Sequence, residues 1–499
     1  MSSSIVPHWI ANKPHRSIDS TILHHPNSGD LVHEVSNASE QDVENAIVAS
    51  HEACQHWRNT TSGLRRKVLL RAAKLLEERA DEFVRTWRRE MDVSHHFAEF
   101  NVRTSISMIE EIAHLISSAL AGELPRTADG NDVCTLVTRE PYGVCLAIAP
   151  WNAAMILSIR SIATPIAAGN TVILRSSEVV PHTHYLWGQL FADAGLPAGC
   201  LNIVHADRDR APGITKQLIE DDRVRHVNFT GSSAVGRHIG RMSGQNLKPC
   251  ILELGGKAPV IILPDADLSV AANNVLFHST LNAGQICMST ERILVPDHLV
   301  EQFTAALQEA ASKSDRFSQD FHEALYSSAS AHRLNGMVDE AVRKGAKVLL
   351  GGTSTPGNLG GVLDQAKYPI TILGDVTRDM TIWKEETFGP LAIVASVQPK
   401  GNGEASIDDA LVLAANDSSY GLAASIFSKD IGRALKIARR LETGMIRINA
   451  GTVGDDPTVV FGGFKDTGFG RFNGAEGLRS FTQSRAISFP YGGPHVLPL

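Results

Sequence analysis

The sequence predicts an α/β protein built on parallel sheets that are covered by helices. Two series of short apolar runs alternate with helical segments, the first from residue 144 and the second over residues 260–448. Strands that alternate with helices pair in parallel, because each helix returns the chain to the same end of the sheet. A helical first third and a hairpin signal precede the first series.

Three amphipathic helices are predicted in the first third. Ser39 followed by Asp42 resembles a capping box with Asp in the usual Glu position, so a helix is expected to begin there. A second helix is expected from about Leu64 through Trp87, and a third over residues 97–121. Their apolar residues recur at about 3.6-residue spacing, which predicts buried faces without a further function.

Residues 124–139 predict a hairpin. Asp129 and Gly130 form a tight-turn pair between two extended runs. Exposed strand edges pair with other strands, so this segment is a candidate oligomerisation arm, and a plain surface hairpin is the alternative.

The first alternating series contains four predicted strands, each followed by a helix, and the last of these helices opens at Ser232. The uncharged stretch 141–159 is long enough to span a membrane. Pro, Gly and Asn residues interrupt it, so a buried strand, a loop and the start of a helix are predicted instead. The four strands are expected at residues 144–149, 171–174, 201–204 and 224–229.

The composition excludes several classes of protein. The 499 residues are 43% apolar and 20% charged with a net charge of −7, which is typical of a soluble globular chain. At about 150 residues per domain, the length predicts two to four domains. No basic run reaches four residues, so the charge cluster of a nucleic-acid-binding protein is absent.

Cysteine and histidine usage argues against a metal site. The six cysteines include no CxxC pair and are too sparse for a disulfide framework, which favours a reducing compartment. His182 and His184 have no acidic or Cys partners at useful spacing, so we expect surface histidines and no metal. The first 14 residues show no secretory signal, and we expect a cytoplasmic protein.

One strand–helix turn has the composition of an anion site. Gly231 and Gly236 stand five apart around Ser232, where a strand ends and a helix opens. Glycine allows close backbone approach to a phosphate, and the helix N-terminus favours an anion. The spacing is not G-x-G-x-x-G, and many such turns bind nothing.

Glu253 and Cys287, 34 residues apart, are a candidate base and nucleophile. A thiol near a carboxylate can be activated for covalent catalysis. The alternative is that Cys287 is a small buried apolar residue, which is the usual fate of a free cysteine.

Six motifs in order resemble the aldehyde dehydrogenase superfamily, and the resemblance covers the chain from about residue 20. The spacing of the motifs matches as well as their letters. They are PWN (150–152), FTGS (229–232), ELGGK (253–257), GQIC (284–287), EETFGP (385–390) and FGGFKDTGFGR (461–471). Segments 152–178, 222–233, 287–295 and 448–457, the last reading INAGTVGDDP, resemble the salicylaldehyde and vanillin dehydrogenase branch, which oxidises aromatic aldehydes.

The resemblance implies a mechanism. Cys287 would attack the aldehyde carbon, and Asn152 with the backbone N–H of Cys287 would hold the resulting oxyanion. Glu253 would activate the water that hydrolyses the thioester. A CoA-acylating enzyme is the alternative, although Glu253 argues against it, and a non-catalytic protein that kept the fold is a third reading.

The resemblance also implies NAD as cofactor, with NADP tolerated. Glu178 would accept hydrogen bonds from the adenine ribose, whereas Arg175, where most of the family has Lys, favours a phosphate. These two side chains could instead pair with each other. The implied cofactor-binding positions are Ile148, Trp151, Arg175, Glu178, Gly231, Ser232, Gly236, Leu254, Glu386 and Phe388.

Arg160, on the helix after PWN, is a candidate contact for a hydroxyl or carbonyl of the substrate, and a salt-bridged surface residue is the alternative. The usual Pro before FGG is Val460 here, and residues 205–210 lack the Gly-rich turn of many members. None of these departures touches Asn152, Glu253 or Cys287.

The resemblance implies an aldehyde dehydrogenase-like fold in three parts. A Rossmann-like cofactor domain would comprise residues 1–123 and 141–254, and an α/β catalytic domain residues 255–452. A β oligomerisation arm and C-terminal segment would comprise residues 124–140 and 453–499, with residues 481–487 as the third strand of the arm. A homodimer or homotetramer would follow, with a small aldehyde as substrate and neither nucleic acid nor membrane as partner.

Overall fold

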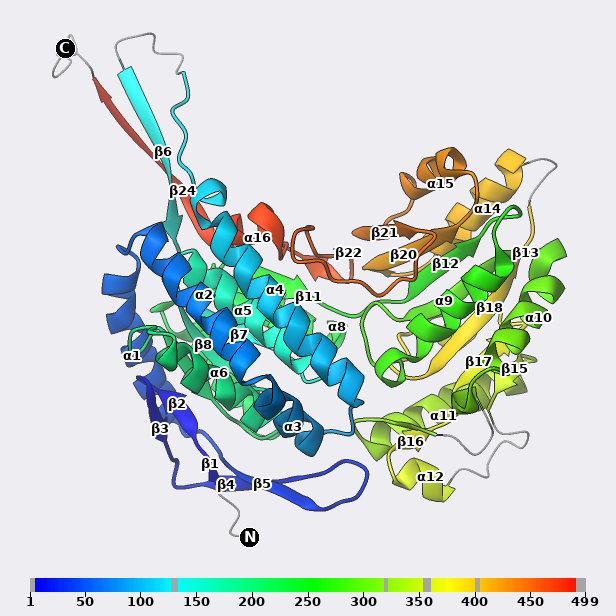
Figure 1. Ribbon diagram of the computed structural model, residues 1–499, viewed down its shortest axis with the longest axis horizontal. Helices are drawn as coiled ribbons and strands as arrows, with labels where there is room; N and C mark the ends of the chain where they lie inside the picture. The colour runs from blue at the N-terminus through cyan, green and yellow to red at the C-terminus, as the bar shows by residue number, and fades with distance from the viewer. Residues whose placement is uncertain (1–4, 127–132, 318–321, 353–359, 400–403, 491–499) are drawn as a thin grey trace.

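The computed structural model of the protein describes residues 5–126, 133–317, 322–352, 360–399 and 404–490. An eight-stranded sheet and a seven-stranded sheet form the two halves of the molecule, and a two-stranded arm projects away from the first half (Figure 1). The α/β class predicted from the alternating series is confirmed.

The eight-stranded sheet has five parallel strands at its centre. From β7 (Val144–Ile148), the chain proceeds to β8 (Thr171–Arg175) and β9 (Leu201–Val204) on one side. It then returns to the other side of β7 for β10 (Val224–Thr230) and β11 (Cys250–Glu253). The strand order therefore reverses between β7 and β10, where sheets of this kind bind ligands at the carboxyl ends of their strands. Antiparallel strands β2 (His8–Ile10), β3 (Lys13–His15) and β23 (Gly468–Phe469) complete the sheet at its edges.

Helices cover both faces of this sheet, as its almost entirely buried central strands require. In β7, Cys145 and Ala147 face one cluster of buried side chains, whereas Val144, Leu146 and Ile148 face another. The first cluster includes side chains of α2 (Ser62–Glu78), α3 (Ala80–Glu90), α4 (His95–Ala119), α5 (Ala154–Ala167) and α6 (Pro181–Asp193), and the second those of α1 (Glu40–Trp57), α7 (Ala211–Glu220) and α8 (Ser233–Gln245).

The seven-stranded sheet repeats this organisation in the second half. Its order is β15-β17-β18-β13-β12-β20-β21, and all pairs are parallel except that of β15 with β17. Helices α9 (Leu268–Thr280) and α10 (Val300–Ala311) pack on one face, and α11 (Ser328–Arg343), α14 (Glu404–Asn416) and α15 (Ile431–Ala438) on the other. The strands are β12 (Ala258–Ile262), β13 (Thr290–Pro296), β15 (Lys347–Gly351), β17 (Thr371–Gly374), β18 (Leu391–Val397), β20 (Ala423–Phe427) and β21 (Met445–Ile448).

The predicted single helix from Leu64 through Trp87 is wrong. The backbone leaves the helical region at Arg79 (φ −107°, ψ 15°), and two helices, α2 and α3, result. The break turns the apolar face of α3 so that Phe83 packs on Trp187 and Trp87 on Phe97, with ring centres 4.7 and 5.8 Å apart. Apolar spacing alone did not distinguish one helix from two in sequence.

The arm differs from the predicted hairpin. Strand β6 (Val133–Pro141) pairs antiparallel with β24 (Thr482–Pro490) over nine residues, so the C-terminal strand is the second strand of this sheet and not the third. The segment before residue 127 meets β6 through a single bridge between Glu123 and Val137. The predicted turn at Asp129 and Gly130 lies outside the described residues.

His184 corrects another expectation, because it is buried in α6 rather than exposed, and its Nδ1 accepts a hydrogen bond from the backbone N–H of Ser177 at 3.3 Å. The uncharged stretch 141–159 forms the end of β6, all of β7 and the first turns of α5, as predicted. Among the described residues, no helix is long and apolar enough to cross a membrane, and no group of three metal-ligating side chains occurs.

The predicted capping box at the start of α1 is present and forms part of a larger network. Asp42 accepts hydrogen bonds from the backbone N–H of Ser39 at 2.9 Å, from Ser17 Oγ at 2.8 Å and from His15 Nε2 at 2.6 Å. Burial raises the pKa of this carboxyl, but the hydrogen bonds from Ser39, Ser17 and His15 outweigh burial and lower the pKa below its usual range.

Asp42→Ala is expected to lower the free energy of unfolding, since loss of a capping interaction costs typically about 1 kcal/mol. The pKa of Asp42 is lowered in the folded state. The stabilisation that ionised Asp42 gives to the folded protein is therefore complete above the ordinary Asp pKa and is lost as the pH falls below about 4. Unfolding curves at pH 8, 6 and 4 measure it, with exposed Glu52→Ala as the control. A difference between variant and wild type that vanishes already at pH 6 would contradict this origin.

Candidate active site

The predicted site residues gather where the two sheets meet. Ile148 and Glu253 are the last residues of β7 and β11, at the carboxyl ends of the first sheet. Cys287 lies three residues before β13, at the amino end of a strand of the second sheet. Since β11 continues through residues 254–257 directly into β12, Glu253 lies at the junction of the two sheets.

An unusual backbone conformation presents Cys287. Asn282, Ala283 and Gly284 all have positive φ (50°, 56° and 69°), which is a costly sequence of conformations for residues other than glycine. The carbonyl oxygen of Cys287 lies so close to Gly256 that a Cβ there would approach it to 2.1 Å. The second glycine of ELGGK is therefore required by contact with the cysteine loop.

Asn152 is tied to the same loop by a ring of three hydrogen bonds. Its side-chain amide donates to the carbonyl of Gln285 at 2.9 Å, and its own carbonyl accepts from the side chain of Asn282 at 3.0 Å. The backbone N–H of Gln285 closes the ring by donating to the carbonyl of Asn282 at 3.1 Å. The predicted oxyanion donor is thus fixed relative to the predicted nucleophile, and neither Asn282 nor Gln285 was singled out from the sequence.

Glu253 is a buried carboxylate that faces the Cys287 thiol. Its side chain is 2% exposed, and apart from that thiol no described residue is a hydrogen-bond partner of its oxygens. Burial raises the pKa of Glu253 to about 7, although the charge of Arg160 and the hydrogen bond from Cys287 oppose the rise. Burial also raises the pKa of the Cys287 thiol well above its usual range, and the charges of Glu253 and Glu386 add to this effect.

Arg160 lies inside the protein rather than on its surface. Its Nη1 is 3.2 Å from Asp455 Oδ2 and its Nη2 is 3.9 Å from Glu253 Oε2. The guanidinium carbon lies 4.2 and 4.7 Å from the ring centres of Phe461 and Phe472. Because Nη1 is engaged by Asp455, the predicted contact with substrate would have to be made through Nε or Nη2, which have no hydrogen-bond partner among the described residues.

Asp455, Phe461 and Phe472 were not predicted as site residues. Asp455 stands in INAGTVGDDP and Phe461 opens FGGFKDTGFGR, so both motifs carried a signal, but their contact with Arg160 depends on tertiary structure.

Aromatic rings border the side of the site nearest β7. Trp151 stacks on Tyr326 with ring centres 4.5 Å apart, and Phe388 meets the Trp151 ring edge-on at 5.8 Å. Trp151 and Phe388 were both predicted to bind the cofactor, from motifs that are far apart in the sequence, and the fold brings them together. Tyr326 was not predicted as a site residue.

The turn after β10 fits an anion. Ser232 is the N-cap of α8 and is exposed, and its side chain accepts from the backbone N–H of Val235. Gly236 packs against Leu254, because a Cβ at that glycine would approach the Leu254 side chain to 2.4 Å. The buried hydroxyl of Thr230, one residue before Gly231, has no partner among the described residues. A helix N-terminus beside an unpartnered hydroxyl suits a pyrophosphate.

Glu386 lies against the ELGGK turn. Its Oε1 accepts from the backbone N–H of Gly256 at 2.9 Å, and a Cβ at Gly255 would approach its Oε2 to 2.4 Å. Burial, followed by the charge of Glu291, raises the pKa of Glu386 to about 8. A carboxyl so placed can accept a hydrogen bond from a ribose hydroxyl.

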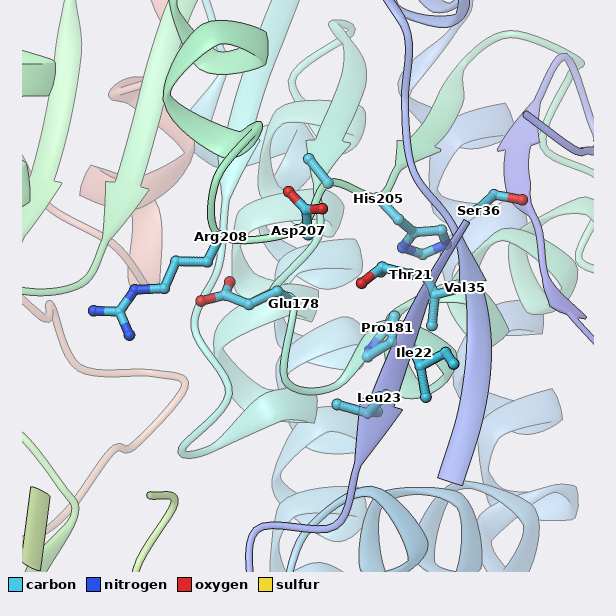
Figure 2. A pocket seen from close by; sticks show the side chains of 11 residues that line it. Thr21, Ile22, Leu23, Val35, Ser36, Glu178, Pro181, His205, Asp207 and Arg208 are labelled. Carbon is cyan, nitrogen blue, oxygen red and sulfur yellow. The ribbon is translucent and has the colours of Figure 1, made fainter. Parts of the chain in front are cut away.

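Glu178 and Arg175 pair with each other, as one of the sequence alternatives held, with Arg175 Nη1 3.7 Å from Glu178 Oε2. Glu178 also lines a cavity of about 230 Å³ (Figure 2). The cavity lies between strand β4 (Ser20–His24), strand β5 (Leu31–Ser36) and the segment after β9 that carries Asp207 and Arg208. Arg175 Nε has no partner among the described residues, so one donor remains for a ligand.

The sequence model described as the aldehyde dehydrogenase family matches residues 9–487. The chain belongs to the aldehyde dehydrogenase family. It is therefore an enzyme that oxidises an aldehyde to the carboxylic acid, with NAD or NADP as the oxidant, and the fold and function implied by the sequence motifs are confirmed.

The chain is similar to enzymes that are named for aromatic aldehydes. It is 38% identical to a vanillin dehydrogenase of Pseudomonas sp. (strain HR199 / DSM 7063) over 98% of this chain and 99% of the relative. A crystal structure of salicylaldehyde dehydrogenase from Pseudomonas putida G7, complexed with salicylaldehyde, matches with a TM-score of 0.90 at 35% identity, covering 99% of each chain.

Two other solved structures bear on the cofactor. An NAD-dependent aldehyde dehydrogenase from Sinorhizobium meliloti has a TM-score of 0.90 at 29% identity, covering 99% of this chain and 96% of that one. An NADP-dependent enzyme of E. coli has a TM-score of 0.88 at 28% identity, covering 97% and 98%. Overall fold therefore does not distinguish the two cofactors.

Cys287 is expected to react slowly with iodoacetamide at pH 7, because only the thiolate reacts and the pKa of this thiol is raised. Glu253→Gln removes a nearby negative charge and should speed the reaction several-fold at pH 7. Mass spectrometry of the Cys287 peptide measures the rate, and the partly exposed Cys250 serves as the internal reference. Slower alkylation of Cys287 in the variant would contradict this electrostatic effect.

Proposed function

We propose that this aldehyde dehydrogenase oxidises an aromatic aldehyde, with Cys287 as nucleophile, Asn152 as oxyanion donor and Glu253 as general base. The observation that carries the proposal is the convergence of these three side chains at the junction of the two sheets, with the carboxylate of Glu253 buried and facing the Cys287 thiol.

The first step is attack of the Cys287 thiolate on the aldehyde carbon, once the thiol has lost its proton to solvent. The carbonyl oxygen becomes the oxyanion of a thiohemiacetal. Asn152 stabilises it with the second N–H of its side-chain amide, the first being donated to the carbonyl of Gln285, together with the backbone N–H of Cys287. A single donor of this kind contributes typically about 10²–10³ in rate.

Oxidation of the thiohemiacetal leaves a thioester on Cys287, and bound NAD or NADP supplies the hydride acceptor. Glu253 then removes a proton from water, the resulting hydroxide adds to the thioester carbon, and Cys287 leaves as the thiolate with release of the acid. A carboxyl with a pKa of about 7 is well matched to this task at neutral pH.

The surroundings of Cys287 support an aromatic substrate. Its side chain packs against a large cluster of buried apolar residues that includes Ile286, Met288 and Phe461, with Trp151 and Tyr326 at the edge of the same cluster. Such walls favour a flat apolar ring. The relatives named for vanillin and salicylaldehyde support the same assignment.

The cofactor is proposed to lie across the carboxyl ends of β7, β8 and β10, with NAD preferred. Ser232 and the turn at Gly231 would hold the pyrophosphate, and Glu386 the nicotinamide ribose. Ile148, Trp151, Gly236, Leu254 and Phe388 would form the walls. Glu178 would bind the adenine ribose, and Arg175 would tolerate a 2′-phosphate.

The CoA-acylating enzyme considered from the sequence is not supported by any observation. Glu253, a base for water, would have no role if a thiol resolved the thioester. The complete set of Asn152, Glu253 and Cys287 likewise argues against a non-catalytic protein.

The arm supports a homo-oligomer. It extends from the body of the protein (Figure 1), and the exposed apolar side chains of Leu136, Ile487 and Phe489 lie along it. We propose that it pairs with another copy to form a dimer or tetramer, and a monomer in light scattering at micromolar concentration would contradict this.

We propose that the chain divides into a cofactor domain (1–123 and 141–254), a catalytic domain (255–452) and an arm with C-terminal segment (124–140 and 453–499). Within the last segment, β23 pairs with β11 rather than with the arm. All six cysteines are free, which supports a proposed cytoplasmic location.

Glu253→Gln is expected to give a burst of NADH followed by slow turnover, because the variant still forms the thioester but lacks the base that hydrolyses it. Stopped-flow absorbance with benzaldehyde and NAD measures both phases. Cys287→Ala, which should bind NAD but form no NADH, is the control.

Three outcomes separate the candidate functions. Turnover that requires CoA would identify the acylating enzyme, and no NADH from any of a panel of benzaldehydes, cinnamaldehydes and aliphatic aldehydes would remove the catalytic proposal. Equal loss of burst and steady-state rate in Glu253→Gln would place this residue before hydride transfer.

NAD is expected to be preferred over NADP by roughly tenfold or less in kcat/KM, equivalent to about 1.4 kcal/mol. Glu178 repels a 2′-phosphate, whereas Arg175 attracts it, and their pairing weakens both effects. Glu178→Gln should narrow or reverse the preference, and Arg175→Gln should widen it. Higher kcat/KM with NADP in the wild type would show that Arg175 dominates.

A further inference from the structure

Arg160 is a buried cation shared by two buried carboxylates from different parts of the chain. The exposed fraction of the side chain is 1% for Arg160, 2% for Glu253 and 8% for Asp455. Arg160 comes from α5, Glu253 from the end of β11 and Asp455 from the loop after β21. One positive charge thus faces two acidic groups in the interior of the protein.

The two carboxylates are held very differently. Asp455 lies 3.2 Å from Arg160 Nη1 and also accepts from Asn473 Nδ2 at 2.7 Å, so its position is fixed on both sides. Glu253 lies 3.9 Å from Arg160 Nη2, beyond hydrogen-bond distance, and apart from the Cys287 thiol no described residue is a hydrogen-bond partner of its carboxylate. Arg160 therefore attracts Glu253 without capping its oxygens.

The guanidinium itself is fixed by aromatic rings. Phe461 and Phe472 lie within 5 Å of its central carbon, and a cation over an aromatic face is stabilised electrostatically. Both rings belong to the segment that also carries β23, the edge strand paired with β11. The same segment thus supports the strand that ends in Glu253 and the cation that faces it.

We propose that Arg160 is a positioning residue for the general base: its charge keeps Glu253 ionised and directed towards Cys287, and Asp455 limits this effect by engaging the same guanidinium. The inference rests on the proposed function, because it concerns the hydrolytic step assigned to Glu253. It gives Arg160 a role in the reaction that involves no contact with the substrate.

The charges around Glu253 make Arg160 decisive. Asp455 and Glu386 are the carboxyl groups that face Glu253, and their charges repel its own, whereas the Cys287 thiol donates a hydrogen bond that favours the ionised form. Within the described part of the chain, Arg160 is the cation that acts on Glu253. Burial and the charge of Asp455 raise the pKa of Glu253, and the charge of Arg160 and the hydrogen bond from Cys287 lower it. A general base for water at neutral pH needs a pKa near 7, which results here from burial that raises the pKa and from the charge of Arg160 that lowers it.

Two substitutions should shift the pH dependence of the hydrolytic rate in opposite directions. Arg160→Met keeps the length of the side chain and removes the charge. The acid limb, meaning the fall of the hydrolytic rate as the pH is lowered and Glu253 takes up a proton, should therefore move up by about one pH unit or more. Asp455→Asn leaves Arg160 to Glu253 alone, so the same limb should move down. Arg160→Lys restores the charge and should retain a limb close to that of the wild type.

The experiment measures the steady-state rate after the NADH burst as a function of pH, with benzaldehyde and NAD. Arg65→Met is the matched control, because Arg65 is also a buried arginine but contacts the carbonyl of Ala167 at the far end of α5. Its acid limb should be unchanged. An unchanged limb in both Arg160→Met and Asp455→Asn, or movement of both in one direction, would overturn the proposal.

Two further outcomes keep the interpretations apart. If Arg160→Met raises KM for hydroxylated benzaldehydes relative to benzaldehyde while the acid limb stays in place, Arg160 contacts the substrate and the positioning role is wrong. If the wild type gives no NADH with any aldehyde, the proposed function fails. Should Arg160→Met not fold, Arg160→Gln removes the same charge and keeps a polar side chain, and an acid limb that stays in place in this variant would overturn the inference.

Discussion

The active site depends on keeping one carboxylate in the interior with its oxygens available. A general base for water is effective only if its oxygens are not taken up by the protein, but an ionised carboxylate without hydrogen bonds is costly to bury. Among the described residues, the Cys287 thiol is the hydrogen-bond partner of Glu253, so its oxygens remain available to water. Arg160, 3.9 Å away, compensates the buried charge. The raised pKa of Glu253, about 7, reflects the balance between burial and the charge of Arg160.

The fold places the carboxylate by joining two sheets end to end. Strand β11 ends at Glu253 and the chain enters β12 after four residues, so Glu253 lies between the carboxyl ends of the first sheet and the cysteine loop of the second. The segment around β23 secures this junction: the N–H of Leu254 donates to the carbonyl of Thr467 at 2.9 Å, and Thr467 Oγ1 donates to the carbonyl of Gly255 at 2.8 Å. ELGGK and FGGFKDTGFGR are therefore two halves of one structural unit.

The sequence predicted those features of the fold that depend on interactions between residues close together in the chain. The capping box at Ser39, the four strands of the first series and the N-cap at Ser232 are where the sequence placed them, because capping groups and apolar runs act over a few residues. The break at Arg79 and the pairing of β6 with β24 were not predicted, since both depend on packing between distant segments. The same holds for the candidate site: motifs predicted Cys287 and Glu253 as its residues, but only the structure shows Arg160 between Glu253 and Asp455.

The central claim is that Cys287 carries the substrate as a thioester that Glu253 releases. The most direct measurement is the mass of the Cys287 peptide after Glu253→Gln protein is mixed with benzaldehyde and NAD and quenched in acid. The account predicts that this peptide gains the mass of the aldehyde less two hydrogens, which is the mass of an acyl group that has replaced the thiol proton. An unmodified Cys287 peptide during NADH formation, or the same adduct on another residue, would contradict the account.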